Sequence, residues 1–208
     1  MGLNLIILSV FVSRIILIAA ASNYDPFKPN LIRSQYFQMG QTNVSFCHQI
    51  NSGKGIPIIM PNSTQGTYGA VQPTTPLSLT PTKCSNFKCT KIPIFHPPVM
   101  SSCKTIVQTL LNNSTGTFIA PPNTWVIVSH GNCASIFQNN VGKQNYTVQS
   151  TWAQFGLESL RLLEQCLWPH PDSNGGHCTF DPYLDNKLLN LGLLLQSWSD
   201  EENIVESY

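Results

Sequence analysis

The stretch NTWVIVSHGNCASIFQNN, residues 123–140, decides the fold. Trp125 to Val128 and Ala134 to Phe137 are rich in β-branched and aromatic residues, which suit the pleated surface of a sheet. Gly131 and Asn132 lie between these runs, and glycine adopts positive φ angles freely, so the pair fits a two-residue hairpin turn. We therefore expect two strands joined by a hairpin. One long strand with a bulge at Gly131 is the alternative.

A helix is predicted upstream of this hairpin, because apolar residues recur there at the spacing of one helix face. Ser102 is placed to cap its start, and Asn112 and Asn113 are placed to end it. The apolar stripe of this helix consists of Cys103, Ile106, Val107 and Leu110.

A second helix is expected after a third short strand, NYTVQS, at residues 145–150. Thr151 and Gln154 have the spacing of a capping box. Gly156 weakens the first turn slightly, and Pro169 follows the end. The expected stripe consists of Leu157, Leu160, Leu163 and Leu167.

The last patterned segment is KLLNLGLLLQSW, residues 187–198. Its leucines at positions 189, 191, 193 and 195 alternate as in a strand, although leucine also favours helices. Gly192 in the middle tips the choice to a strand. The predicted fold class is therefore α+β: a small antiparallel sheet with two helices on one face.

The N-terminal half has a different character. Residues 1–21 are apolar and end in Ala19, Ala20 and Ala21, which fits a cleaved signal peptide. Arg14 interrupts the run, so no stable membrane anchor is expected, although an uncleaved anchor or a buried helix is the alternative. Residues 22–98 include the Pro/Thr-rich stretch QPTTPLSLTPT and are expected to be irregular, with at most one short docked strand. The α+β domain then spans residues 99–198, and an acidic tail spans 199–208.

Cysteine usage indicates an oxidising compartment, in which seven cysteines form up to three bridges. The odd cysteine either pairs between chains or stays buried. Cys166 and Cys178 are close in sequence and form a candidate pair. Because Cys84-x4-Cys89 has no second matching pair, a zinc site is disfavoured. The bridge candidates are Cys47, Cys84, Cys89, Cys103, Cys133, Cys166 and Cys178.

Charge and sequons agree with export. Arg14 is the only charged residue among the first 21, so its removal with the leader leaves ten basic and ten acidic residues. A neutral chain lacks the electrostatic footprint of a nucleic-acid-binding protein and the basic stretch that holds a protein on an anionic membrane. Asn-x-Ser/Thr acceptors for N-glycans occur at Asn43, Asn62, Asn112, Asn113 and Asn145.

His130 near Cys133 raises the question of catalysis. The HGNC and CLWPHP blocks echo T2-type ribonucleases, but their order is reversed, and no Glu or Lys accompanies His130 as acid, base or phosphorane ligand. A cysteine nucleophile would use Cys133 with His130 or His177, which requires a free thiolate. We expect no catalytic residues.

Other sites are also weakly supported. No Gly-x-Ser-x-Gly elbow occurs, and few carboxylates remain for a glycosidase pair outside the tail. Aromatic residues could form a sugar-binding platform, but core packing is the better interpretation. These aromatic residues are Trp125, Trp152, Phe155 and Phe137.

Residues 95–198 resemble a known family in their order of cysteines and apolar blocks. PPVMSSCKTIVQTLLNN, NTWVIVSHGNCASIFQNN, YTVQSTWAQFGLESLRLLEQC and GGHC follow one another as in the Hce2-type fungal secreted effectors, the necrosis-inducing extracellular proteins. Ser102-Cys103 corresponds to the family's helix opening, and Gly131-Asn132-Cys133 to its Gly-x-Cys. Val148 to Leu163 corresponds to the strand-helix step, and Cys166, Gly175 and Gly176 to the closing block.

The resemblance implies a secreted, extracellular effector that is not an enzyme. It would act by binding an unknown protein or glycan target of a host, a competitor or a cell surface, without a cofactor, a metal or nucleic acid. Cys103, Cys133 and Cys166 would be framework residues, and His130 a turn or strand residue. Two alternatives remain: a small secreted hydrolase of the T2 type, and a cell-wall-associated structural glycoprotein.

Overall fold

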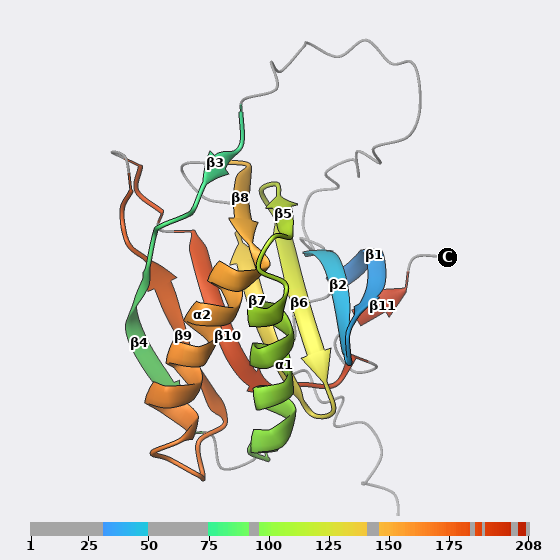
Figure 1. The fold of residues 1–208 in the computed structure, drawn as a ribbon, viewed down its shortest axis with the longest axis vertical. Coiled ribbons are helices and arrows are strands. Elements are labelled where there is room, and N and C mark those ends of the chain that lie inside the picture. The colour runs from blue at the N-terminus through green and yellow to red at the C-terminus, as the bar shows by residue number, and fades with distance from the viewer. Residues whose placement is uncertain are drawn as a thin grey trace, which may run out of the picture.

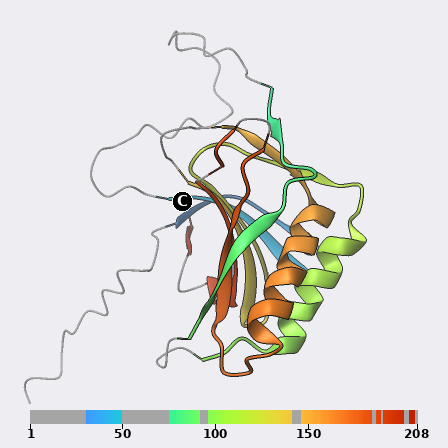
Figure 2. The ribbon, with the colours of Figure 1, turned by 90° about the vertical axis from the view of Figure 1, so that its left-hand side faces the viewer.

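The computed structural model describes residues 31–49, 75–91, 96–140, 146–183, 186–188, 190–200 and 204–206. Within these residues, an eight-stranded sheet carries two helices side by side on one of its faces (Figures 1 and 2). Neighbouring strands are antiparallel except for the edge pair β11 and β1. The spatial order is β11 (Ile204–Glu206), β1 (Leu31–Met39), β2 (Thr42–Gln49), β6 (Thr124–His130), β7 (Cys133–Asn139), β10 (Leu191–Ser197), β9 (Gly175–Phe180) and β4 (Cys84–Thr90).

The predicted central hairpin is confirmed. β6 and β7 pair along their whole length, and His130 faces Cys133 across the two-residue turn. Gly131 has a φ of +54°, which glycine tolerates without strain. The bulge alternative is therefore wrong. Six of the seven residues of β7 and the first six of β6 are buried, which explains their continuous apolar run.

The expectation of an irregular segment over residues 22–98 is wrong where the structure describes that segment. β1 and β2 form a hairpin there, and β2 pairs with β6 at the centre of the sheet. β4 pairs with β9 at the opposite edge, so residue 98 is not a domain boundary in the sheet. The sheet is accordingly larger than expected. The leader and residues 50–74 lie outside the described residues.

A smaller sheet lies beside the main one and receives the predicted third strand. It contains, in spatial order, β3 (Leu77–Ser78), β8 (Val148–Thr151) and β5 (Thr117–Ala120). β3 is the one part of the Pro/Thr-rich stretch that forms a strand in the described residues, and it pairs with β8 in parallel. The predicted last strand is also confirmed as β10, in which Leu191, Leu193 and Leu195 are buried. Leu189 lies outside the described residues.

Helix α1 (Met100–Asn112) buries all four residues of its predicted stripe. It ends at Asn112 with Asn113 as the C-cap, as expected. Its start differs, because Val99 rather than Ser102 is the N-cap and no side chain caps the helix. The amide oxygen of Asn132, in the hairpin turn, accepts from the Val99 N–H at 2.8 Å. The hairpin turn therefore fixes the point at which α1 begins.

Helix α2 (Trp152–Leu162) continues as a π-helical turn, Leu163–Leu167. Thr151 caps it and accepts from the Gln154 N–H at 3.0 Å, but the Gln154 side chain does not return the bond and donates to the Thr82 carbonyl instead. The predicted leucine stripe is wrong in part, since Leu157 is 42% exposed. The buried face is instead Trp152, Phe155, Gly156, Glu158, Ser159 and Leu162.

Gly156 explains why the buried face of α2 differs from the predicted leucine stripe. A Cβ atom at this position would lie 2.8 Å from the Leu110 Cβ and 3.0 Å from the Leu111 N of α1, so only glycine permits the two helices to approach this closely. Gly156 lowers the helix propensity of α2, but it is also the residue at which α2 contacts α1.

The core between helices and sheet is aromatic at its centre. The ring centroids of Phe118 and Trp152 are 4.7 Å apart, Phe155 stacks on Trp152, and Phe137 packs edge-on against Phe118 and Phe155. Trp125 is buried on the opposite face of the sheet. The aromatic residues therefore serve core packing, as the preferred interpretation had it, and do not form a sugar-binding platform.

Three disulfides join these layers. Cys84–Cys178 links β4 to β9, Cys89–Cys166 links β4 to the turn after α2, and Cys103–Cys133 links α1 to β7. The expectation of three bridges is confirmed. The pairing of Cys166 with Cys178 is wrong, because each of the two is bonded to a cysteine of β4, Cys166 to Cys89 and Cys178 to Cys84. Nearness in sequence therefore gave no guide to nearness in space.

Removing the bridge between α1 and β7 is expected to destabilise the fold. The double variant Cys103→Ala with Cys133→Ala opens a covalent loop spanning a separation of 30 residues. For a loop of this length we expect the free energy of unfolding to fall by about 3–4 kcal/mol. Urea denaturation measures this, with Gln108→Ala on the exposed side of α1 as a control that leaves stability unchanged. A loss no larger than that of the control would contradict the bridge.

Candidate functional site

The residues that raised the question of catalysis have structural roles. Cys133 is bridged to Cys103, so the proposed cysteine nucleophile is wrong. The Nδ1–H of His130 donates to the Gln41 carbonyl at 2.8 Å, which ties the β1–β2 turn to the central hairpin. His177 lies on β9, three strands away from β6. Among the described residues, no group of three or more His, Cys, Asp or Glu is placed to hold a metal ion.

The glycan acceptors differ in accessibility. Asn112 is exposed at the end of α1, whereas Asn113 is half-buried and directs its amide toward the Met39 sulfur. Asn43 on β2 is half-buried and accepts from the Tyr36 hydroxyl at 2.9 Å. Asn62 and Asn145 lie outside the described residues. Of the acceptors that the structure describes, Asn112 is the best placed for a glycan.

Cys47 is the one cysteine without a bridge, and it stays buried, as one of the two expected outcomes had it. It lies on the sheet face opposite the helices, in a cluster with Leu31, Trp125 and Ile127. Burial raises the pKa of its thiol to about 12, and Asp200 adds to the rise while Arg33 opposes it. The thiol is therefore protonated at any physiological pH and makes a poor nucleophile.

We expect the Cys47 thiol to be unreactive in the folded protein. At about pH 8, well below the raised pKa, iodoacetamide should leave the native chain unmodified. Unfolding without reductant should then expose one reactive thiol per chain. Mass spectrometry counts the added groups, and Cys47→Ala serves as the blank. Stoichiometric labelling of the native protein would contradict the burial of this residue.

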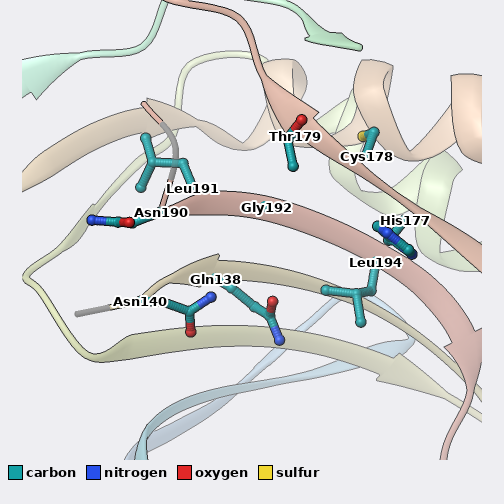
Figure 3. A pocket seen from close by; sticks show the side chains of 9 residues that line it. All are labelled: Gln138, Asn140, His177, Cys178, Thr179, Asn190, Leu191, Gly192 and Leu194. Atoms are coloured by element: carbon teal, nitrogen blue, oxygen red, sulfur yellow. The ribbon is translucent and has the colours of Figure 1, made fainter. Parts of the chain in front are cut away.

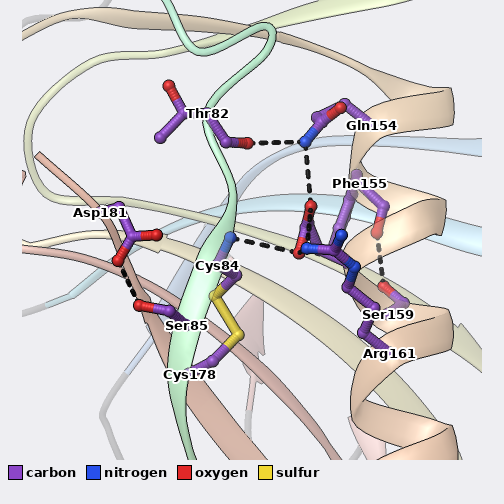
Figure 4. Close-up of polar contacts among 10 residues, drawn as sticks. Thr82, Cys84, Ser85, Gln154, Phe155, Ser159, Arg161, Cys178 and Asp181 are labelled. Atoms are coloured by element: carbon purple, nitrogen blue, oxygen red, sulfur yellow. Dashed lines mark hydrogen bonds and ion pairs between the residues drawn. A yellow bond between two sulfur atoms is a disulfide. The ribbon is translucent and has the colours of Figure 1, made fainter. Parts of the chain in front are cut away.

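Glu158 is the second buried titratable group. Its carboxylate accepts from the Cys84 N–H at 3.1 Å, from Gln154 Nε2 at 3.1 Å and from Arg161 Nη1 at 3.2 Å (Figure 4). These contacts connect α2 to the start of β4 beside the Cys84–Cys178 bridge. Burial raises the pKa of Glu158 above its usual 4.5, and it outweighs the lowering effect of the Cys84 N–H and of the Arg161 guanidinium. Because its carboxylate is buried and bonds to groups of the chain itself, Glu158 is a structural anchor rather than an exposed acid.

The raised pKa of Glu158 predicts a pH dependence of stability. The folded state holds the proton more tightly than the unfolded chain, so the contribution of Glu158 is fully present below pH 4.5 and is lost as the pH rises through its folded-state pKa. Glu158→Gln cannot titrate. The free energy of unfolding of the wild type minus that of this variant should therefore fall with rising pH, then level off, in urea titrations from about pH 4 to about pH 8. A difference that grows with pH would show that the ionised form is the favoured one.

A hollow of about 280 Å³ lies on the sheet where β7, β10 and β9 run side by side (Figure 3). It opens on the face opposite the helices, because Leu191, Leu193 and Leu195 of β10 point into the helix-side core while Gly192 and Leu194 alternate to the other face. Side chains that surround Gly192 in the hollow are Gln138, Asn140, His177, Thr179, Asn190 and Leu194.

Strand register determines this lining. One row of facing residues runs across the sheet from Trp125 through Gln138, Gly192 and Thr179 to Ser85. The adjacent row contains Ile127, Ile136, Leu194, His177 and Lys88 in the same strand order. This face is therefore apolar over β6 and polar over β9 and β4. The hollow lies at the boundary between the apolar part and the polar part.

Polar, uncharged side chains stand around the hollow, although most of its surface is formed by apolar atoms. Among the described residues, the side chains of Gln138, Asn140, His177 and Thr179 make no hydrogen bond with another residue. Among the described residues that line it, none carries a carboxylate, an ammonium or a guanidinium group. Among these lining residues, His177 is the one whose side chain is an acid-base group near neutral pH. Gly192 inside a strand pattern is the one sequence signal that pointed here, and it was used only to distinguish strand from helix.

Comparisons of this chain with protein-family models, curated proteins and solved structures find no match. The resemblance to the Hce2-type effectors therefore stays a prediction. None of the described helices has the length and apolar character needed to cross a membrane.

Proposed function

We propose that this protein is a secreted, effector-like glycoprotein that acts by binding a target of a host, a competitor or a cell surface, without catalysis. The observation that carries the proposal is the set of three disulfides within one small core. Bridges of this kind form and persist outside the cytosol, where they stabilise small exported domains. Their number and placement fit an extracellular protein.

The reactive groups support a binding role. Of the seven cysteines, six are consumed in bridges and Cys47 is buried with a raised pKa. Glu158 is enclosed by its own donors, and His130 is engaged with a backbone carbonyl. The hollow over Gly192 is then the best candidate for contact with a target, because the side chains of Gln138, His177 and Thr179 that line it make no hydrogen bond with another described residue.

The bridge pattern also agrees with the framework role that the Hce2-type resemblance implies. Cys103 and Cys133, which match the helix opening and the Gly-x-Cys of that pattern, are bonded to each other. Cys166 is bonded to Cys89, which lies before the region of resemblance. A cysteine framework that extends beyond residues 95–198 supports one exported body rather than a domain with a separable N-terminal half.

Expression in a eukaryotic secretory host tests export and binding chemistry together. We expect the protein in the culture fluid, with an N-terminus near Ala21 or Ser22 and a mass that reduction raises by two hydrogens for each of the three bridges. Enzymatic deglycosylation should lower the mass, and Asn112→Gln should remove part of this loss. Retention in the cytosol with all cysteines titratable would sink the proposal, and recovery in the cell-wall fraction would favour the structural alternative.

The purified protein should also leave RNA intact. Cleavage that disappears in His130→Ala would replace the proposal with the T2-type hydrolase. Gln108→Ala is the matched control, because its exposed side chain lies on α1, away from the hairpin.

A further inference from the structure

We propose that the hollow over Gly192 binds a neutral, hydroxyl-rich ring, that is, one sugar unit of a glycan. This inference rests on the proposed binding function and names the ligand class for its site. The hollow lies on the open face of the sheet between β7, β10 and β9, as Figure 3 shows, so a ring enters it without movement of the helices.

The first argument is that the fold itself does not require glycine at position 192. Its φ is not in the left-handed region, unlike those of Gly131 and Gly175. A Cβ atom there would lie 3.6 Å from the Cys178 carbonyl oxygen and 3.7 Å from Gln138 Oε1, which are ordinary contacts. Glycine inside a strand is destabilising and often marks a place where a ligand approaches the backbone closely. The missing side chain leaves the floor of the hollow bare.

Gly176 on the neighbouring strand β9 differs from Gly192 in that packing requires a glycine there. A Cβ atom at Gly176 would lie 2.6 Å from the Cys166 sulfur, so that glycine is required by the bridge. Packing therefore explains Gly176 but not Gly192. The free space above Gly192 is the feature that the inference explains.

The second argument is the chemistry of the rim. Gln138 and Asn140 each offer an amide donor and an amide acceptor, and Thr179 and His177 add groups of both kinds. A hydroxyl group also donates and accepts, so a ring with several hydroxyls satisfies these partners, whereas an apolar ligand would leave them buried without bonds. Leu194 supplies an apolar surface for the C–H groups of the ring.

The size of the hollow and the charge of its lining narrow the class of ligand further. A volume of about 280 Å³ lies just below the usual range of ligand pockets, so the hollow can hold one ring and not an extended chain. An anionic ligand would call for a cation, but Lys88, which pairs with His177 across the sheet, does not line the hollow. A nucleobase is held by stacking on aromatic side chains, of which the described lining offers His177 alone, with no Phe, Tyr or Trp to form the other side of a stack.

Titration of the secreted protein with a panel of neutral monosaccharides and their short oligomers, followed by NMR or calorimetry, tests the inference. Gly192→Val fills the floor with a strand-compatible side chain, and we expect it to weaken binding at least roughly tenfold, the scale set by a blocked subsite. Gln138→Ala should weaken binding roughly fivefold, as for one lost hydrogen bond. Gln108→Ala on the opposite layer is the matched control and should bind as the wild type does. Equal unfolding midpoints of the variants would show that the fold is retained.

The inference is overturned if no sugar of the panel binds, or if Gly192→Val binds as tightly as the wild type. It is also overturned if nucleosides or an anionic sugar phosphate bind to this hollow while neutral sugars do not. The proposed function fails on other evidence, namely cytosolic retention or hydrolysis, so the two outcomes are distinguishable. A secreted and bridged protein without sugar binding would leave the proposed function and reject only this ligand class.

Discussion

The burial of the β6–β7 hairpin on both of its faces is the constraint from which the rest of the structure follows. Val126 and Val128 face the helices, while Ile127 and Ile136 face the other way, and all are excluded from solvent. A strand pair of this kind needs cover on two sides. The helices give one cover, and Leu31, Trp198 and Ile204 belong to the other cluster. The N-terminal hairpin and the C-terminal strand are therefore parts of the core.

Some of the buried polar groups form hydrogen-bonded pairs that also fix how the layers meet. The Ser135 and Ser159 hydroxyls lie 2.6 Å apart between β7 and α2, and the Ser159 hydroxyl also contacts the Phe155 carbonyl at 2.7 Å. Asn139 donates to the carbonyls of Ala120 and Tyr146 and so holds the smaller sheet at the end of β7. A buried polar group without a partner costs free energy. Each of these contacts forms in only one relative position of the layers and therefore favours that position.

Local patterns were readable from the sequence, and features that depend on pairing were not. The α1 stripe and the central hairpin are written in adjacent residues, so α1 and β6–β7 appear where expected. β1 and β2 were missed because the surrounding Pro- and Thr-rich composition outweighed the alternation of Val44 and Phe46. Cys84 and Cys178 meet only because β4 joins β9 at the sheet edge, which no spacing along the chain reveals. The hollow likewise arises from cross-strand register.

The same register explains why the hollow forms at this point of the sheet. Moving from β6 toward β4 along one row, Trp125 gives way to Gln138, then to Gly192, then to Thr179. The apolar part of this face is buried in its own cluster, and the polar part needs no such cover. Gly192 lies at this boundary, opposite Gln138 on β7 and Thr179 on β9. A ligand that matches both sides of this boundary must combine an apolar surface with hydroxyl groups, which is the combination that a sugar ring provides.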